Sequence, residues 1–347
     1  MCVYGHFAFG QEKLNGQTVK TKILADTLQE VFGSYEVMTA DTHGGIKMLL
    51  KIPVQCWNML RSCYNIVILP AQNGLRVIAP ILVIMNLLFH RKLHYVVIGG
   101  WLPAFLKKRL FLARILRFFD YIYIETSVMQ TALKEQGFCN LYVMPNCKNL
   151  NPLLEPELIQ VGREPYRLCT FSRVMEEKGI GDAVAAVKSV NERFGRTVYT
   201  LDIYGQVDIR QEEWFDCLQN TFAPGIGYKG SVPYSQSTQV LKEYFALLFP
   251  THFYTEGVPG TLIDAYSAGV PVICSRWESF ADVVDDGVTG IGIPFGRPEA
   301  LAIRLTEIAQ NPGQLLDMRV ACLKKAATFL PKYALEVLIK NINARIK

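Results

Sequence analysis

The sequence predicts an α/β protein of two doubly wound domains, each with a parallel sheet between helices. Short apolar runs such as YNIVILP, HYVVIGG and PVICS alternate with helix-length segments along the whole chain. These runs are apolar on both faces, as expected for parallel strands that helices cover on both sides. The 347 residues also exceed what one hydrophobic core usually organises, which favours two domains over one.

The alternation assigns the elements of the first half in order. Strands are expected where β-branched and aromatic residues cluster, at 3–4, 35–39, 66–69, 95–98, 121–124 and 141–144. Helices are expected in the segments between them, at 18–31, 75–89, 102–119 and 127–136. Repeated strand–helix–strand order implies crossover connections and therefore parallel sheets.

The second half repeats the pattern after a proline-containing, acidic stretch at 149–167 that lacks a periodic apolar face, which is typical of a boundary. Strands are expected at 168–171, 198–204, 226–229, 246–249 and 270–274. Helices are expected at 180–194, 211–222, 235–244, 261–268 and 299–310, and the terminal YALEVLIKNINARIK also predicts a helix. The predicted domains are 1–155 and 156–330.

Charge is unevenly distributed. Residues 1–165 contain 17 Lys/Arg and 11 Asp/Glu, 17 − 11 = +6, whereas the remainder contains 19 and 20, or −1. A basic first half predicts an anionic partner for that half alone. Nucleic acid is not expected, because no aromatic binding motif accompanies the charge.

The cysteines and the amino-terminal segment indicate a cytoplasmic protein. Nine cysteines are scattered without a C-x-x-C pair or zinc-ligand spacing, which favours core thiols, a reducing compartment and no metal site. The start, MCVYGHFAFG, lacks the basic and long apolar regions of a signal peptide.

Two apolar segments raise the question of membrane contact. Residues 77–89 form the most hydrophobic window, but a span needs about 20 apolar residues, so we expect a buried helix. Residues 105–119 combine five cations with aromatic residues and leucines, as an interfacial segment could. A partly buried helix with solvated cations is the alternative there.

Ligands of open α/β sheets bind at the carboxyl ends of the strands. After the first strand, Gly10 and Gly16 bracket a loop before a helix whose free N–H groups could meet an anion. An ordinary turn is the alternative, and no Walker A pattern is present. After the strand at 168–171, Arg173 and Lys178 could neutralise a diphosphate. The alternative is a solvated helix start.

The stretch HFYTEGVPGTLIDAYSAG predicts a loop and then a helix that begins near Gly260 and Thr261. The helix amides and dipole would attract a phosphate. Glu256 precedes these amides and Asp264 follows them by about one turn, so the acids would flank the anion. This order matches a nucleotide-sugar, with Glu256 near sugar hydroxyls and Asp264 near the ribose. The alternative is a helix cap for Glu256 and a surface carboxylate for Asp264.

FSRVMEEKGI followed by TEGVPGTLIDAYSAGVPVICS resembles the retaining glycosyltransferases of family 4, especially bacterial members that build capsular, exopolysaccharide or O-antigen chains. GHFAFG, NGQTVKTK, VIGGWLPAFL, VMPNCKNL and DDGVTGIGI extend the resemblance over nearly the whole chain. It implies a GT-B fold, two Rossmann-like domains facing across a cleft. The first would bind the acceptor and the second the donor, and a helix at about 331–347 would cross back to the first.

The resemblance also implies roles for individual residues. Arg173 and Lys178 match the diphosphate-binding cations, and Glu256 matches the first glutamate of the E-x7-E motif, which contacts the donor sugar. Asp264 occupies the second acid position, which contacts the ribose. It is one methylene shorter than the usual glutamate, so a shifted backbone or a bridging water would be needed.

Further donor contacts are implied by the same pattern. Gly16 would lie near the diphosphate, and Val232 near the base. The segment whose backbone amides touch the β-phosphate and sugar corresponds to Val258, Pro259, Gly260, Thr261 and Leu262.

On the acceptor side, many relatives have a histidine in the cleft after a central strand. Here Gly100 and Trp101 occupy that end of the strand, whereas His94 lies at its start. We therefore assign acceptor binding to Gly100 and Trp101 and no catalytic role to His94.

The resulting expectation is a retaining glycosyltransferase that needs no metal or other cofactor. It would use a nucleotide-sugar donor, UDP- or GDP-linked, and a growing or polyprenyl-linked saccharide acceptor. Catalysis would depend on Glu256, Arg173 and Lys178. The protein would be cytoplasmic, with peripheral contact to an anionic membrane. The alternatives are a nucleotide-sugar epimerase of the same fold and a non-catalytic partner of another glycosyltransferase.

Overall fold

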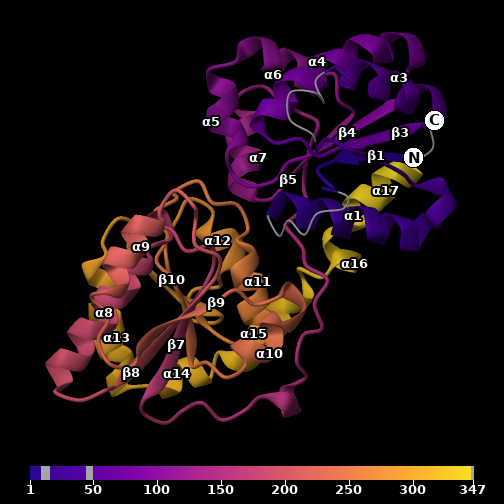
Figure 1. The fold of residues 1–347 in the computed structure, drawn as a ribbon. Helices are drawn as coiled ribbons and strands as arrows, with labels where there is room; N and C mark the ends of the chain where they lie inside the picture. Colours follow the sequence, from indigo (N-terminus) through magenta and orange to yellow (C-terminus); the bar gives the residue numbers. More distant parts are fainter. Residues whose placement is uncertain (9–15, 44–49, 345–347) are drawn as a thin grey trace. The chain divides into compact units, whose positions relative to one another are not determined.

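A computed structural model describes residues 1–8, 16–43 and 50–344 of the chain (Figure 1). The chain divides into two compact units. The first comprises Met1–Asn149 with Phe329–Lys347, and the second comprises Leu150–Thr328. The loop expected at Gly10 lies outside the described residues, as does the end of the expected terminal helix after residue 344.

The first unit contains a six-stranded parallel sheet of order β2-β1-β3-β4-β5-β6. Its central strands are almost fully buried, which explains why their sequences are apolar on both faces. The strands are β1 (Cys2–Gly5), β2 (Met38–Asp41), β3 (Asn65–Ile68), β4 (Lys92–Val96), β5 (Tyr121–Ile124) and β6 (Leu141–Val143).

Helices cover both faces of this sheet and form two separate hydrophobic clusters with it. One face is covered by α3 (Ile52–Ser62), α4 (Gln72–Phe89), α5 (Leu102–Lys107), α6 (Leu110–Leu116) and α7 (Ser127–Lys134). The other is covered by α1 (Gly16–Phe32), α16 (Pro331–Ala334) and α17 (Glu336–Asn343). A 3-10 turn, η1 (Ser34–Glu36), precedes β2, so the strand expected at 35–39 begins later than predicted.

The single helix expected at 102–119 is wrong, because the structure has two short helices there. Arg109 donates its backbone N–H to Leu106 O, one residue short of the α-helical acceptor. Phe105 O instead accepts from the Arg109 side chain at 3.0 Å. The Arg109 guanidinium also lies 3.9 Å from the centre of the Phe105 ring. The side chain thus takes the carbonyl that would have continued the helix.

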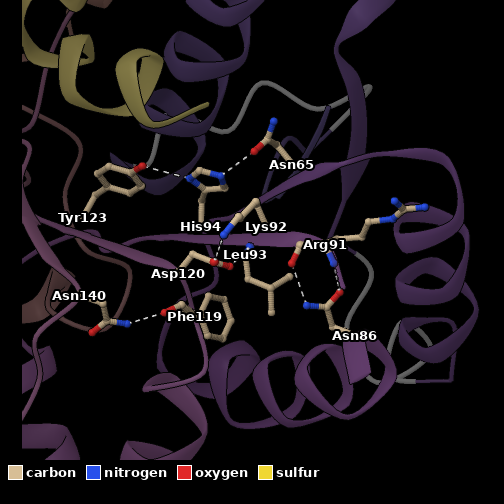
Figure 2. Close-up of polar contacts among 10 residues, drawn as sticks. All are labelled: Asn65, Asn86, Arg91, Lys92, Leu93, His94, Phe119, Asp120, Tyr123 and Asn140. Atoms are coloured by element: carbon tan, nitrogen blue, oxygen red, sulfur yellow. Dashed lines mark hydrogen bonds and ion pairs between the residues drawn. The ribbon is translucent and has the colours of Figure 1, made fainter. Parts of the chain in front are cut away.

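His94 links the sheet to the carboxyl-terminal helix (Figure 2). It is fully buried in the middle of β4, which corrects its expected position at the start of the strand. Its Nδ1 lies 3.0 Å from Tyr123 Oη, and its Nε2 lies 3.0 Å from Asn65 Oδ1. Asn341 of α17 donates to Tyr123 Oη at 3.2 Å. Burial lowers the pKa of His94 to about 3, so the ring is neutral and structural.

Replacing His94 by glutamine should reduce the pH dependence of stability. The folded pKa near 3 lies below the ordinary value of about 6.5. As pH falls between these values, only the unfolded chain takes up the proton. The contribution of His94 is therefore complete above about pH 6.5 and is lost by up to about 1.4 kcal/mol per pH unit below it. In urea unfolding, the native advantage over H94Q should shrink as the pH falls; a difference independent of pH would contradict this.

The second unit contains a parallel sheet of order β12-β11-β10-β7-β8-β9. Its strands are β7 (Tyr166–Phe171), β8 (Tyr199–Tyr204), β9 (Ile226–Gly230), β10 (Ala246–Phe249), β11 (Val272–Ser275) and β12 (Gly290–Ile293). One face packs against α8 (Ile180–Phe194), α9 (Glu212–Gln219) and α13 (Glu299–Gln310).

The remaining helices of the second unit include a connected group formed by α10 (Ser237–Leu241), α11 (Gly260–Ser267) and α15 (Arg319–Ala327). The short elements are η2 (Glu155–Glu157), η3 (Glu176–Lys178), η4 (Tyr234–Gln236), α12 (Phe280–Val283) and α14 (Gly313–Leu316). All nine cysteines of the chain carry free thiols; seven are buried, while Cys139 and Cys217 are exposed.

Candidate functional site

The strand order of the second sheet identifies the region where a ligand would bind. From β7 the chain continues to β8 and β9 on one side, and from β10 it continues to β11 and β12 on the other. Ligands of doubly wound folds bind at such a switch point, beyond the carboxyl ends of the two strands. The loops at 172–179 and 250–259 follow β7 and β10, and they contain Arg173, Lys178 and Glu256.

These two loops are in direct contact. His252 donates its backbone N–H to Glu177 O at 2.8 Å. Gly179 has φ 71°, and a Cβ at this position would lie 2.0 Å from Pro250 O. Only glycine permits both this backbone conformation and this close approach. The packing therefore fixes Lys178, the preceding residue, next to the loop after β10.

Lys178 and Glu256 form an ion pair between the two loops. Their side chains are only 18% and 17% exposed. The Lys178 ammonium also lies 5.3 Å and 5.0 Å from the ring centres of Phe249 and Phe253, within cation–π range. Glu256 thus binds a lysine of another loop, which contradicts the alternative that it only caps a helix.

Arg173 lies beside a different carboxylate. Its Nη1 is 3.6 Å from Asp208 Oδ2, and its side chain is 51% exposed. Arg210 holds the same carboxylate through Nε at 3.0 Å and Nη2 at 3.1 Å. These bonds, with the Arg210 backbone N–H and the charge of Arg173, hold the pKa of Asp208 well below its usual range. The structure therefore brings Lys178 to Glu256 directly and Arg173 to a second charged cluster.

Sequence reasoning missed Asp208 and Arg210. Both follow β8, the neighbour of β7, in the segment YGQVDIR. Gly205 allows the loops after β7 and β8 to meet, since a Cβ there would lie 1.8 Å from Ser172 O. Their position directly after a predicted strand was the available signal.

The first turn of α11 presents backbone N–H groups at the end of the loop after β10. Pro259 occupies the N-cap position, and no side chain within the described part of the chain caps this helix. The Thr261 side chain is buried, and its Oγ1 has no hydrogen-bond partner among the residues described. Val258 and Leu262 are buried and Gly260 is half-buried. The free amides and the helix dipole make this turn suitable for an anion.

Asp264 lies on α11 and is 2% exposed, so it is not a surface carboxylate. The Ser237 hydroxyl of α10 donates to Asp264 Oδ1 at 2.9 Å. Glu256 and Asp264 therefore face different elements, the loop after β7 and helix α10. Val232 is half-buried between β9 and η4, five residues before Ser237.

The predicted residues of the first unit lie at the amino end of α1 and after β4. Gly16 is the first residue of α1 and is exposed. Gly100 is buried and Trp101 is half-buried. Trp101 donates its ring N–H to Ile98 O at 2.7 Å and packs edge-on against Phe105. These two contacts fix the position of the Trp101 ring just before α5.

A second polar cluster, also missed, lies at the carboxyl ends of β1 and β2. His6 Nδ1 is 2.8 Å from Thr18 Oγ1, and His6 Nε2 is 3.1 Å from His43 Nδ1. Asp41 Oδ1 accepts the backbone N–H groups of Phe7 at 3.0 Å and His43 at 2.8 Å. One carboxylate thus holds the backbone beside both histidines.

A buried ion pair lies further along the same sheet edge. Lys20 of α1 donates to Glu125 Oε1 at 2.6 Å and to Val97 O at 3.2 Å. Both charged side chains are 2% exposed. Within the described ranges, no group of three or more His, Cys, Asp or Glu side chains is placed to hold a metal ion.

Comparison with known proteins finds a family match in the second unit and similar folds over the whole chain. Residues 165–311 match the family described as glycosyl transferases group 1. This segment includes Arg173, Lys178, Glu256 and Asp264. The predicted fold class is confirmed: two six-stranded parallel sheets with flanking helices, as in GT-B glycosyltransferases.

The individual relatives share little sequence identity with this chain. The amylovoran biosynthesis glycosyltransferase AmsK of Erwinia amylovora is 26% identical over 175 residues, 48% of this chain and 41% of that protein. The match therefore spans about two fifths of that relative. The crystal structure of Anabaena Alr3699/HepE with UDP and glucose has a TM-score of 0.74 and 14% identity, covering 98% of both chains. Sucrose-phosphate synthase from Thermosynechococcus elongatus has a TM-score of 0.78, 14% identity and the same coverage.

Proposed function

We propose that the protein is a retaining glycosyltransferase. It moves a sugar from a nucleotide-sugar, UDP- or GDP-linked, to a hydroxyl of a lipid-linked or growing polysaccharide. The main support is the Lys178–Glu256 pair at the switch point of the second sheet, on the loop that leads to the uncapped first turn of α11. The relative AmsK is described as acting in amylovoran biosynthesis, and HepE is seen with UDP and glucose.

The donor would bind with its diphosphate at Lys178 and the amides of Gly260 and Thr261. The unpartnered Thr261 hydroxyl would gain a phosphate oxygen as its acceptor. Glu256 would accept hydrogen bonds from the sugar hydroxyls, and Asp264 from the ribose. The buried position of Asp264 beside Ser237 supports a bridging water or a small shift of α10 for this contact.

Sugar transfer would break the bond between the anomeric carbon and the diphosphate oxygen, and the electron pair would leave with that oxygen. Lys178, Arg173 and the α11 amides would stabilise the charge that develops there. The acceptor hydroxyl would form the new bond on the same face of the sugar and pass its proton to the departing phosphate. These steps use positive groups of the chain, and we propose that no metal ion is required.

The acceptor would bind at the carboxyl edge of the first sheet, where Gly100 and Trp101 follow β4. The His6–His43 pair at the same edge offers ring nitrogens for hydrogen bonds to saccharide hydroxyls. An aromatic ring such as Trp101 can also pack against the apolar face of a sugar.

The proposal predicts transfer with retention by the purified chain. Thermal shift with UDP- and GDP-sugars would identify the donor, because binding to the folded state raises the unfolding temperature. The chain would then be incubated with that donor and lipid-linked saccharides from bacterial membranes, with and without a chelator. We expect a product with the anomeric configuration of the donor in both conditions, measured by nuclear magnetic resonance.

Other outcomes would contradict the proposal. A product with the opposite anomeric configuration to the donor would exclude transfer with retention. Loss of activity with the chelator would exclude a metal-independent transfer. Conversion of the sugar nucleotide without an acceptor would identify an epimerase. A chain that neither binds nor uses any donor in the panel would be a non-catalytic partner.

A further inference from the structure

The first unit has an extended outer surface formed by α3, α4 and α6, which lie along one face of its sheet (Figure 1). Contacts join α3 to α4 and α4 to α6. The inner side of α4 belongs to the core through Leu75, Ile78 and Leu82. The helix expected at 77–89 to be buried is therefore buried on one side only.

The outer side of this surface is apolar. Within the described part of the chain, α4 is the one helix with the length and composition of a membrane span, and only 28% of its 18 residues are buried. Large apolar side chains on the three helices and directly after α6 are between 45% and 76% exposed: Val54, Trp57, Ile84, Leu87, Leu88, Leu110, Phe111 and Phe118. Isolated exposed apolar residues are ordinary, but a cluster over adjoining helices indicates an interaction surface.

The charge of the same region has one sign. Residues 50–119 contain ten lysines and arginines and no aspartate or glutamate. Seven of the cations are exposed and form no ion pair within the described residues: Lys51, Arg61, Arg76, Lys107, Lys108, Arg114 and Arg117. The charged side chains of α3, α4 and α6 themselves are therefore all positive.

We propose that this surface docks on an anionic lipid bilayer, with the apolar side chains among the headgroups and the cations on lipid phosphates. The combination of exposed apolar and cationic side chains on one helical face is typical of interfacial binding. Trp57, which packs edge-on against Phe89 at the end of α4, has the amphipathic ring that favours the headgroup region. If α4 left the core to span the bilayer, Leu75, Ile78 and Leu82 would lose their contacts with the core. We therefore propose that α4 stays in place and contacts the bilayer with its outer side.

A second copy of the chain fits this surface less well. In a symmetric dimer the same patch would face itself, so the cations of one copy would lie opposite those of the other. The patch contains no carboxylate to neutralise them. The sequence alone indicated only residues 105–119. The structure adds α4 as a neighbour of that segment, and α3 as a neighbour of α4. The inference goes beyond the proposed function, because lipid binding requires neither donor nor acceptor.

The test is flotation of the full chain with vesicles of phosphatidylcholine, alone or mixed equally with phosphatidylglycerol. We expect binding to the anionic vesicles that weakens as salt is added. L87E/L88E should lower the partition by at least about tenfold, since two exposed leucines would become carboxylates. K107Q/K108Q should lower it by about fivefold per charge removed.

Matched controls use exposed residues of the second unit. I303E and K324Q introduce the same kinds of change on α13 and α15 and should leave the partition unchanged. Brominated lipid should quench the fluorescence of Trp57, so that W57F loses most of the quenching. This second readout does not depend on the folding of the leucine variant.

Three results would overturn the proposal. The first is equal flotation of L87E/L88E and the native chain. The second is absence of binding to anionic vesicles. The third is a concentration-dependent dimer that L87E/L88E dissociates and that does not bind vesicles, which would identify a second copy as the partner. Loss of sugar transfer with intact flotation would affect the proposed function alone.

Discussion

Lys178→Gln is expected to lower turnover with the donor sugar by about 100- to 1,000-fold, the effect of removing one fixed group that stabilises transition-state charge. Lys178 is held at the switch point by Glu256 and by two aromatic rings, so its charge is already oriented before the donor binds. The measurement is the rate of nucleoside diphosphate release with saturating donor and acceptor.

Two further variants separate catalysis from folding. K178Q alone leaves the Glu256 carboxylate, which is mostly buried, without its lysine, so we expect some loss of stability as well. The double variant K178Q/E256Q removes both charges and should recover stability but not turnover. K324Q changes an exposed lysine of α15 and should behave as the native chain. Recovery of turnover in the double variant would show that Lys178 acts only as a structural partner.

Gly179→Ala is expected to cost about 2–4 kcal/mol of the free energy of unfolding of the second unit, the sum of a positive-φ penalty and overpacking. The added Cβ would lie 2.0 Å from Pro250 O, a backbone atom that cannot move aside alone. Separation of the loops after β7 and β10 would also displace Lys178 from Glu256. We therefore expect G179A to unfold at a lower urea concentration than the native chain and to bind the donor more weakly.

Gly195→Ala provides the matched control for this glycine. Gly195 also has a positive φ, 64°, but no atom lies within 4 Å of the Cβ position. Its substitution should cost only the backbone term, about 1–2 kcal/mol, and should leave donor binding intact. Equal losses of stability in the two variants would show that contact between the loops is unimportant.

Of the strands in the two sheets, the sequence predicted all but β12. β12 has the sequence GIGI, which lacks the usual strand composition. In the structure, a Cβ at Gly290 would lie 2.5 Å from Val272 O, and one at Gly292 would lie 2.6 Å from Phe280 Cζ. Glycine is required because β12 closely approaches β11 and the segment after it, which no local pattern reveals. The short helix α3 was also missed.

The candidate site was predictable where it depends on position after a strand. Lys178 and Glu256 could each be placed after a strand from the expected order of elements, but only the structure shows that β7 lies beside β10 and that their loops are neighbours. The partners of the charged side chains were harder to predict from the sequence. Arg173, for example, contacts Asp208 only because β7 lies beside β8. The His6–His43 contact likewise depends on β1 lying beside β2. Residues far apart in sequence supply these contacts, and one sequence holds no direct record of them.

The crystal structure of the chain with bound UDP is the most direct test of the diphosphate site at the switch point. Our account predicts the terminal phosphate within hydrogen-bond distance of Lys178 Nζ and the amides of Gly260 and Thr261, with the ribose on the side of Asp264. A diphosphate bound elsewhere, with the Lys178–Glu256 pair and the first turn of α11 untouched, would contradict it.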